Sequence, residues 1–215
     1  MEIIDVENWN RKKQYDWFKS FSNPCYGITK KMNVTNLIKY TKETKTSFFV
    51  NMLYIVVKGL NTVEEMKMRF ENNIPVKYDE LNPAYTVMTD CGSFENVRHE
   101  FIEDYKEFYK LAKKYIEKTK HLTKLSNESY NSNNKYNDYY ITCLPWLDFA
   151  SMTHPIPDDI HSSSVPRICW GKYHQINNEY YIDLNITVSH IFVDGLALCT
   201  VFNNIQDLLI KCKFE

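Results

Sequence analysis

Hydrophobic and polar residues alternate most regularly near the C-terminus of the chain. From Ile182 to Val188 every second side chain is aliphatic and those between are polar, and this period of two predicts a β-strand with one face in the core. Over residues 198–212 the apolar positions recur at helical spacing, which predicts an amphipathic helix. Residues 190–195 therefore lie at a strand-to-helix junction, where α/β enzymes often place the groups that carry their chemistry.

The same kind of pattern predicts the other strands. They are expected at residues 28–34, 65–70, 75–78, 84–89, 140–144, 167–173 and 180–188. Turns at Asn72-Asn73 and Asn177-Asn178 would close two hairpins. The strands at 65–70, 75–78 and 84–89 would be antiparallel neighbours. A polar segment at 118–138, rich in Lys, Asn and Ser, is typical of an exposed loop.

Helical spacing of apolar residues predicts further helices before the last one. The first begins at about Thr35, whose hydroxyl would cap it. The second begins at Ser47 and is apolar around most of its circumference, so we expect it to be buried against a sheet. The third, at residues 97–117, has an apolar side and a charged side that faces water.

The length and charge of the chain narrow the classes of protein to which it can belong. A length of 215 residues predicts one domain of ordinary size, over residues 1–215. A net charge of −1 and the lack of a basic stripe interleaved with aromatic residues indicate no nucleic-acid partner. The longest apolar run, residues 52–57, is too short to cross a bilayer, and the N-terminus has no signal-peptide core. We therefore expect a cytoplasmic protein with no membrane partner.

The six cysteines are scattered singly, with no C-x-x-C pair. This spacing favours reduced thiols over a disulfide framework or a zinc site, so no metal is expected. A catalytic cysteine is the alternative, but no motif supports it.

His190 is the residue whose position best suits catalysis. Histidine is the side chain whose unperturbed pKa lets it take up and return a proton near neutral pH. The preceding strand would hold its backbone, and Asp194 and Gly195 follow, an acid and a residue that is free to turn. The alternative is an ordinary surface or core histidine, because H-x-x-x-D-G alone is a weak motif.

Five short motifs, spread from end to end of the chain, carry a family resemblance. They are D-V-x-N-W-x-R at residues 5–11, P-C at 24–25, L-P-W-x-x-F at 144–149, K-Y at 172–173 and H-x-x-x-D-G at 190–195. In these motifs the chain resembles the chloramphenicol acetyltransferase family of CoA-dependent acyltransferases. The resemblance implies an α/β fold, a two-layer sandwich of a mixed, largely antiparallel sheet packed with helices. It also implies direct acetyl transfer from acetyl-CoA to the hydroxyl of a small molecule, most readily chloramphenicol, with antibiotic resistance as the result.

The resemblance assigns the catalytic roles. His190 would be the general base, and Thr142 would donate to the oxyanion at a position where the family usually has serine. Asp194 would form a buried pair with Arg11 and hold the loop, rather than act on the imidazole. From the residues alone, Thr142 could equally be a routine strand threonine and Arg11 a solvated surface charge.

The resemblance also assigns binding roles. Lys172 and Tyr173 would lie near CoA, although a surface lysine and a strand tyrosine are the plain alternatives. The residues expected around the acceptor are Phe18, Cys25, Tyr26, Trp146 and Cys169. Three positions depart from the family: Phe18 replaces a tyrosine, Cys169 a threonine, and Ser189 the first histidine of a pair. The first two departures remove hydroxyl groups from the acceptor side.

The resemblance further implies a homotrimer with its sites between subunits. His190 would come from one chain, and Thr142 and Phe18 from its neighbour. Two other functions stay open at this point: acyl transfer to a different alcohol by the same residues, and a non-catalytic trimeric protein that binds hydrophobic drugs.

Overall fold

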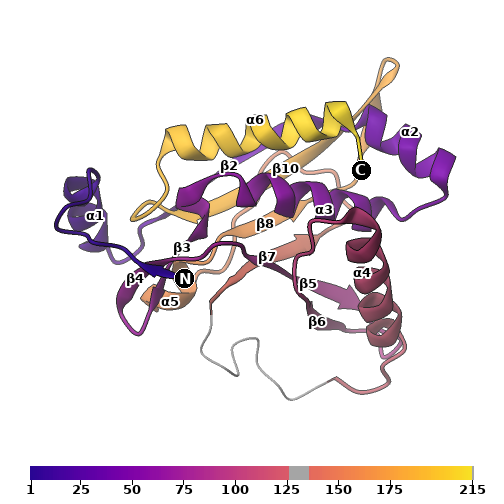
Figure 1. Ribbon diagram of the computed structural model, residues 1–215. Coiled ribbons are helices and arrows are strands. Elements are labelled where there is room, and N and C mark those ends of the chain that lie inside the picture. Colours follow the sequence, from indigo (N-terminus) through magenta and orange to yellow (C-terminus); the bar gives the residue numbers. More distant parts are fainter. Residues whose placement is uncertain (126–135, 215) are drawn as a thin grey trace.

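A mixed β-sheet forms the centre of the computed structural model, which describes residues 1–125 and 136–214 (Figure 1). Across the sheet the strands follow the order β2 (Cys25–Asn33), β10 (Glu179–Ser189), β8 (Arg167–Trp170), β7 (Asp138–Cys143), β5 (Asn82–Met88) and β6 (Phe94–Arg98). The short strand β9 (His174–Ile176) also pairs with β10. β7 is parallel to β5 and to β8, while the remaining pairs are antiparallel. The expected mixed, largely antiparallel sheet is confirmed.

Helices pack against this sheet and against one another. They are α2 (Thr35–Thr44), α3 (Phe48–Asn61), α4 (Tyr105–Lys120) and α6 (Gly195–Lys211). α2 contacts β10, α3 and α4 contact β5, and α6 contacts β2, and Figure 1 shows α3 and α6 lying along the sheet. α3 and α6 come close at Gly59, where a Cβ atom would lie 2.4 Å from Cγ1 of Ile205. The missing side chain thus lets the two helices that cover the core approach each other.

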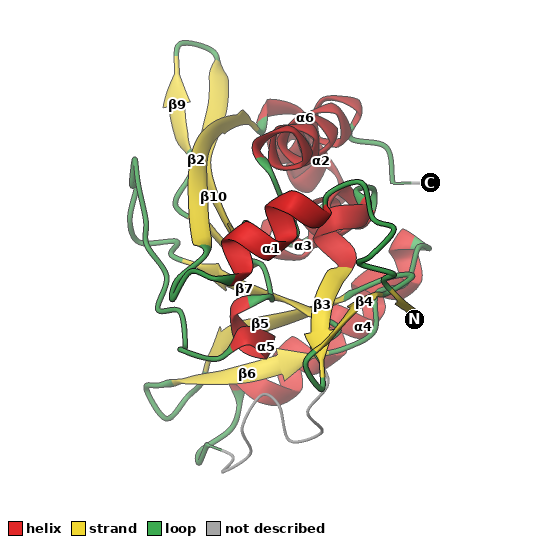
Figure 2. Ribbon diagram, turned by 90° about the vertical axis from the view of Figure 1, so that its left-hand side faces the viewer, coloured by secondary structure: helices red, strands yellow, loops and turns green. Residues whose placement is uncertain are grey.

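A second, small sheet lies beside the first (Figure 2). Its order is β1 (Glu2–Ile3), β4 (Ile74–Lys77) and β3 (Met68–Glu71). The hairpin expected here is confirmed, and Asn72 and Asn73 take the positive φ angles, 50° and 64°, that a tight two-residue turn needs. The prediction that a strand at 84–89 lies beside this hairpin is wrong. Those residues belong to β5, whose two edges are already paired with β6 and β7.

The helix expected at 97–117 begins later than its apolar pattern indicates. Val97 lies in β6 and pairs with Tyr85 of β5. α4 starts after Asp104, whose carboxylate accepts a 2.9 Å hydrogen bond from the amide of Glu107. The boundary was misplaced because apolar residues in this stretch fit the period of a strand as well as that of a helix.

The starts of α2 and α3 differ in their capping. Ser47 caps α3 as expected, since its hydroxyl accepts from the amide of Val50. The hydroxyl of Thr35 does not cap α2. It accepts a 2.8 Å hydrogen bond from the amide of Tyr180, and so joins the start of α2 to β10.

The remaining elements are α1 (Lys12–Lys19), the 3-10 helix η1 (Glu64–Lys67) and α5 (Ile160–Ser163). η1 takes the place of the first part of the strand expected at 65–70. The turn at Asn177-Asn178 joins β9, rather than β8, to β10.

The polar loop expected at 118–138 lies partly outside the described residues, at 126–135. Within the described ranges, no helix is both long and apolar enough to cross a bilayer.

Candidate active site

His190 is the first residue after β10, and its position is fixed from two directions. Its backbone amide donates a 2.9 Å hydrogen bond to the carbonyl of Pro24. Its ring stacks on Phe18 of α1, with ring centroids 3.8 Å apart and planes 9° apart, and it also contacts the ring of Tyr26 at 4.6 Å. The Nδ1 atom is buried and has no hydrogen-bond partner within the described part of the chain. The imidazole is therefore held by ring contacts rather than by a carboxylate.

Asp194 uses its two carboxylate oxygens elsewhere. Oδ1 accepts from the amide of Ala197 at 2.9 Å and so caps α6, while Oδ2 lies 3.1 Å from Nη1 of Arg11. The Arg11 side chain is 13% exposed and that of Asp194 is 41% exposed, so the ion pair is only half buried. Arg11 also approaches Glu65, at 3.5 Å. These contacts tie α1, the 190–195 loop and the start of α6 together.

Tyr26 lies between the histidine and this loop. Its hydroxyl is 3.4 Å from the carbonyl oxygen of Val193, to which it donates. Burial, and to a smaller extent the charge of Asp194, raise the pKa of Tyr26 to about 12. The phenol beside His190 is therefore uncharged at neutral pH and can only donate or accept a hydrogen bond.

Thr142 lies at the end of β7 and lines a cavity of about 610 Å³. Its hydroxyl is 3.2 Å from that of Thr86 on β5, so one of the two donates to the other. The cavity also contains three further residues that the sequence analysis singled out: Trp146, Lys172 and Tyr173. A hydroxyl donor, an ammonium group and two aromatic faces thus meet around one space.

The mouth of this cavity carries exposed aromatic side chains. Trp146 is 71% exposed, and Tyr173, which is 39% exposed, contacts Phe48 at the start of α3. The backbone amide of Lys172 donates to the carbonyl of Leu147, so the segment that follows β8 is linked to the L-P-W loop. The exposed aromatic faces can stack on a planar group, and the ammonium can meet a phosphate.

His190 and Thr142 belong to separate regions of one chain. Neither His190 nor Phe18 lines the cavity that contains Thr142. Phe18 was expected on the Thr142 side, and this is wrong because its ring stacks on His190 of the same chain. The helix α1 that carries Phe18 is linked to the 190–195 loop through Arg11, which brings Phe18 to the histidine.

The cysteines among the expected site residues are buried or half-buried thiols. The thiol of Cys25 donates weakly to the carbonyl of Ser163, and burial raises its pKa. Cys169 is fully buried on β8 and lies opposite Thr142 in the strand register, and burial raises its pKa to about 12. A raised pKa leaves little thiolate at neutral pH, which disfavours a catalytic cysteine.

A second cavity, of about 440 Å³, adjoins the region of the histidine. Cys25 and Tyr26 line it together with His154 and Asn185. His154 lies 3.1 Å from the side-chain oxygen of Asn185, and burial lowers its pKa. His154 lies in a loop with no recognisable motif, so the sequence alone does not predict it as a site residue.

Other residues of the Thr142 cavity were also missed. Phe48, Phe94 and Trp170 line it, but they come from three distant parts of the sequence. Of these three residues, only Trp170 lies close to a recognised motif, since it comes two residues before the K-Y motif.

Comparisons with known proteins agree on one family. The family model described as chloramphenicol acetyltransferase matches residues 1–206. A chloramphenicol acetyltransferase of Campylobacter coli is 30% identical over 97% of this chain and 98% of its own, and one of Clostridium perfringens is 26% identical over 96% and 93%. The solved structure of a chloramphenicol acetyltransferase superposes with a TM-score of 0.87 at 24% identity, covering 97% of this chain and all of its own. A probable dihydrolipoamide acetyltransferase of Listeria monocytogenes shares the fold, with a TM-score of 0.64 at 13% identity over 100% of this chain and 95% of its own.

Proposed function

Because the chain belongs to the chloramphenicol acetyltransferase family and is an acyltransferase, we propose that it transfers acetyl from acetyl-CoA to a hydroxyl of chloramphenicol or of a similar alcohol. The observation that carries the proposal is the placement of His190. It lies at a strand-to-helix junction with its ring fixed on Phe18, next to a loop that the Arg11–Asp194 pair holds. A positioned imidazole of this kind is what general-base catalysis on a hydroxyl requires.

In the proposed reaction, neutral His190 takes the proton from the acceptor hydroxyl as its oxygen attacks the acetyl carbonyl carbon. Thr142 donates a hydrogen bond to the oxyanion of the tetrahedral intermediate. The carbon–sulfur bond then breaks, and the imidazolium returns its proton to the CoA thiolate. The products are the acetyl ester and CoA, and these steps need neither an acyl-enzyme nor a metal.

Asp194 has a positioning role in this scheme. Its oxygens are engaged by the amide of Ala197 and by Arg11, which argues against a proton relay from His190 to the carboxylate. The pair would instead keep the 190–195 loop in the shape that presents the imidazole.

A homotrimer would complete the site, and the separation of the two regions within one chain supports it. The side of the site contributed by one subunit would hold His190, Phe18 and Tyr26. The side contributed by its neighbour would hold Thr142 and the cavity with Lys172, where acetyl-CoA would bind. A closed ring of three copies would form three such sites, one at each interface. A cytoplasmic location would supply acetyl-CoA.

Two residues expected around the acceptor offer no hydroxyl group to it, Phe18 and Cys169. Phe18 has no hydroxyl to offer to a substrate, and its ring is already in contact with His190. Cys169 is fully buried. A hydrophobic alcohol other than chloramphenicol is therefore the second candidate acceptor.

The test is CoA release, followed with a thiol reagent that does not reach the protein cysteines on the time scale of the assay. Acetyl-CoA and the protein are mixed with chloramphenicol or with one of a panel of other alcohols. Release that depends on the alcohol, together with one acetyl ester per CoA by mass spectrometry, is the expected result. Drug binding without CoA release for any alcohol would refute the enzyme and leave the non-catalytic drug-binding protein.

A further inference from the structure

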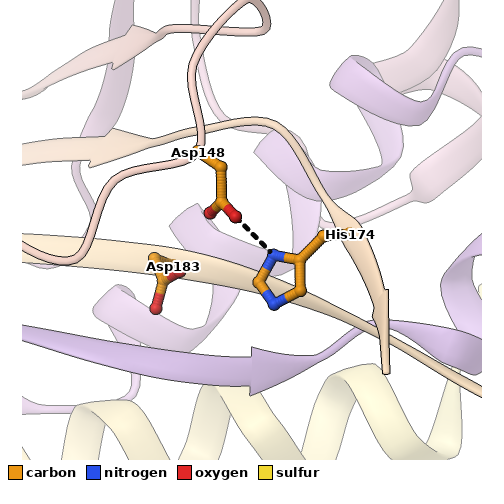
Figure 3. A group of neighbouring side chains, drawn as sticks. All are labelled: Asp148, His174 and Asp183. Atoms are coloured by element: carbon orange, nitrogen blue, oxygen red, sulfur yellow. Dashed lines mark ion pairs between the residues drawn. The ribbon is translucent and has the colours of Figure 1, made fainter. Parts of the chain in front are cut away.

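Three side chains from separate segments converge on one side of β10 (Figure 3). Asp148 lies in the loop after β7, His174 is the first residue of β9, and Asp183 lies in β10. Their ligand atoms all lie within 4.8 Å of one another, and Nδ1 of His174 is 3.2 Å from Oδ2 of Asp148. Nδ1 is buried and forms no regular hydrogen bond within the described part of the chain.

An ammonium group approaches this cluster, and one of its carboxylates is largely buried. The Asp183 side chain is only 10% exposed. The ammonium of Lys31 lies 3.8 Å from Oδ2 of Asp183 and 3.1 Å from Nε2 of His174. Two carboxylates, one imidazole and one ammonium thus meet here, and the carboxylates and the imidazole are groups that can bind a cation.

We propose that Asp148, His174 and Asp183 bind one divalent metal ion of the zinc type. Two carboxylate oxygens and one imidazole nitrogen are ligands that Zn²⁺ prefers, and water would complete the coordination. The ligand atoms must draw together to reach metal–ligand distances of roughly 2.0–2.2 Å. The Asp148 side chain is half exposed and that of Lys31 is 47% exposed, so the carboxylate can move inward and the ammonium can move out to water.

The bound ion would stabilise the L-P-W loop, which forms part of the wall of the cavity that contains Thr142. Asp148 follows Trp146 and Leu147 in the L-P-W loop, and the carbonyl of Leu147 already accepts from the amide of Lys172. A metal bound to Asp148 would fix the same loop to β9 and β10. This site is structural, takes no part in proton transfer, and does not depend on the proposed acceptor.

The experiment uses full-length, tag-free protein treated with a chelator and then dialysed. Binding of Zn²⁺ is measured by titration calorimetry, and binding of Co²⁺ is followed by its visible absorption. Tm is recorded with and without Zn²⁺. We expect one ion per chain and a rise in Tm. His174→Gln and Asp183→Asn should bind at least tenfold more weakly and show no rise. His121→Gln, which alters a more exposed histidine that also lies beside an aspartate, 2.9 Å from Asp90, should behave as wild type.

Lys31→Gln gives an independent check. Removing the ammonium should tighten metal binding about tenfold, because the ion no longer has to displace a positive charge, whereas an unchanged affinity would place the metal elsewhere. The proposal is overturned by a wild-type protein that binds no stoichiometric Zn²⁺. It is also overturned by His174→Gln and Asp183→Asn variants that bind as wild type, or by a thiolate charge-transfer band with Co²⁺, which would place the metal on cysteine.

Discussion

The imidazole of His190 lies flat against the phenyl ring of Phe18, with 3.8 Å between the ring centroids and 9° between the planes. The two residues are distant in sequence, and helix α1 brings them together. The stack restricts the rotation of the imidazole without taking up either ring nitrogen in a hydrogen bond. Phe18 would therefore position the proposed base, in addition to any contact that it makes with the acceptor.

Phe18→Tyr should keep the stack and add a hydroxyl on the acceptor side. If that hydroxyl finds a partner on chloramphenicol, kcat/KM should rise about fivefold, which corresponds to about 1 kcal/mol. Phe18→Leu is the matched control, because it removes the ring and should lower kcat while the fold is kept. Steady-state kinetics on both variants measure this. A Leu variant with the wild-type kcat would contradict the positioning role.

Asp194→Asn should lower both thermal stability and rate. The amide oxygen of asparagine can still cap α6, so this change removes only the charge that faces Arg11. Because the pair is half buried, we expect a loss of about 1–3 kcal/mol in the free energy of unfolding, between the values for exposed and buried pairs.

Asp194→Ala also removes the cap and should cost about 1 kcal/mol more than Asp194→Asn. Chemical denaturation of both variants measures how much free energy of unfolding each substitution removes. A rate loss in Asp194→Asn with unchanged stability would place the carboxylate in proton transfer, contrary to the positioning role.

Stability should fall as the pH falls below about 6.5. Burial lowers the pKa of both His99 and His154 from the ordinary value of 6.5. The folded chain therefore stays unprotonated at these rings where the unfolded chain binds protons, and the free energy of unfolding decreases toward lower pH.

His99→Phe should flatten this dependence, since its ring packs among the aromatic side chains Tyr85, Phe108 and Tyr115. Tm measured between pH 8 and pH 5 compares this variant with the wild type, and an identical slope in the two would count against a buried neutral His99.

The sequence predicts the strand, the loop and the helix around His190 well, because all three follow from local periodicity. The start of α4 is predicted badly, since Val97 suits either element and only its pairing with Tyr85 decides. Motifs identify Thr142 and Lys172, but the cavity that unites them depends on Phe94 and Phe48, which no local pattern connects. The contact between Phe18 and His190 is likewise set by the docking of α1 through Arg11, a tertiary relationship that spacing does not encode.

Co-expression of two inactive chains tests whether the site is shared. His190→Ala chains and Thr142→Ala chains should each be nearly inactive. Mixed trimers should recover part of the activity, because some interfaces then join an intact histidine to an intact threonine. Light scattering that shows a monomer, or mixed assemblies as inactive as either parent, would refute a site between subunits.

The most direct test of the account is the rate of CoA release by His190→Ala. With acetyl-CoA and the best acceptor found for the wild type, removal of the general base should lower the rate by a factor on the order of 10²–10⁴, while circular dichroism and Tm stay close to wild type. A His190→Ala variant that releases CoA within about tenfold of the wild-type rate would contradict the assignment of His190 as the base.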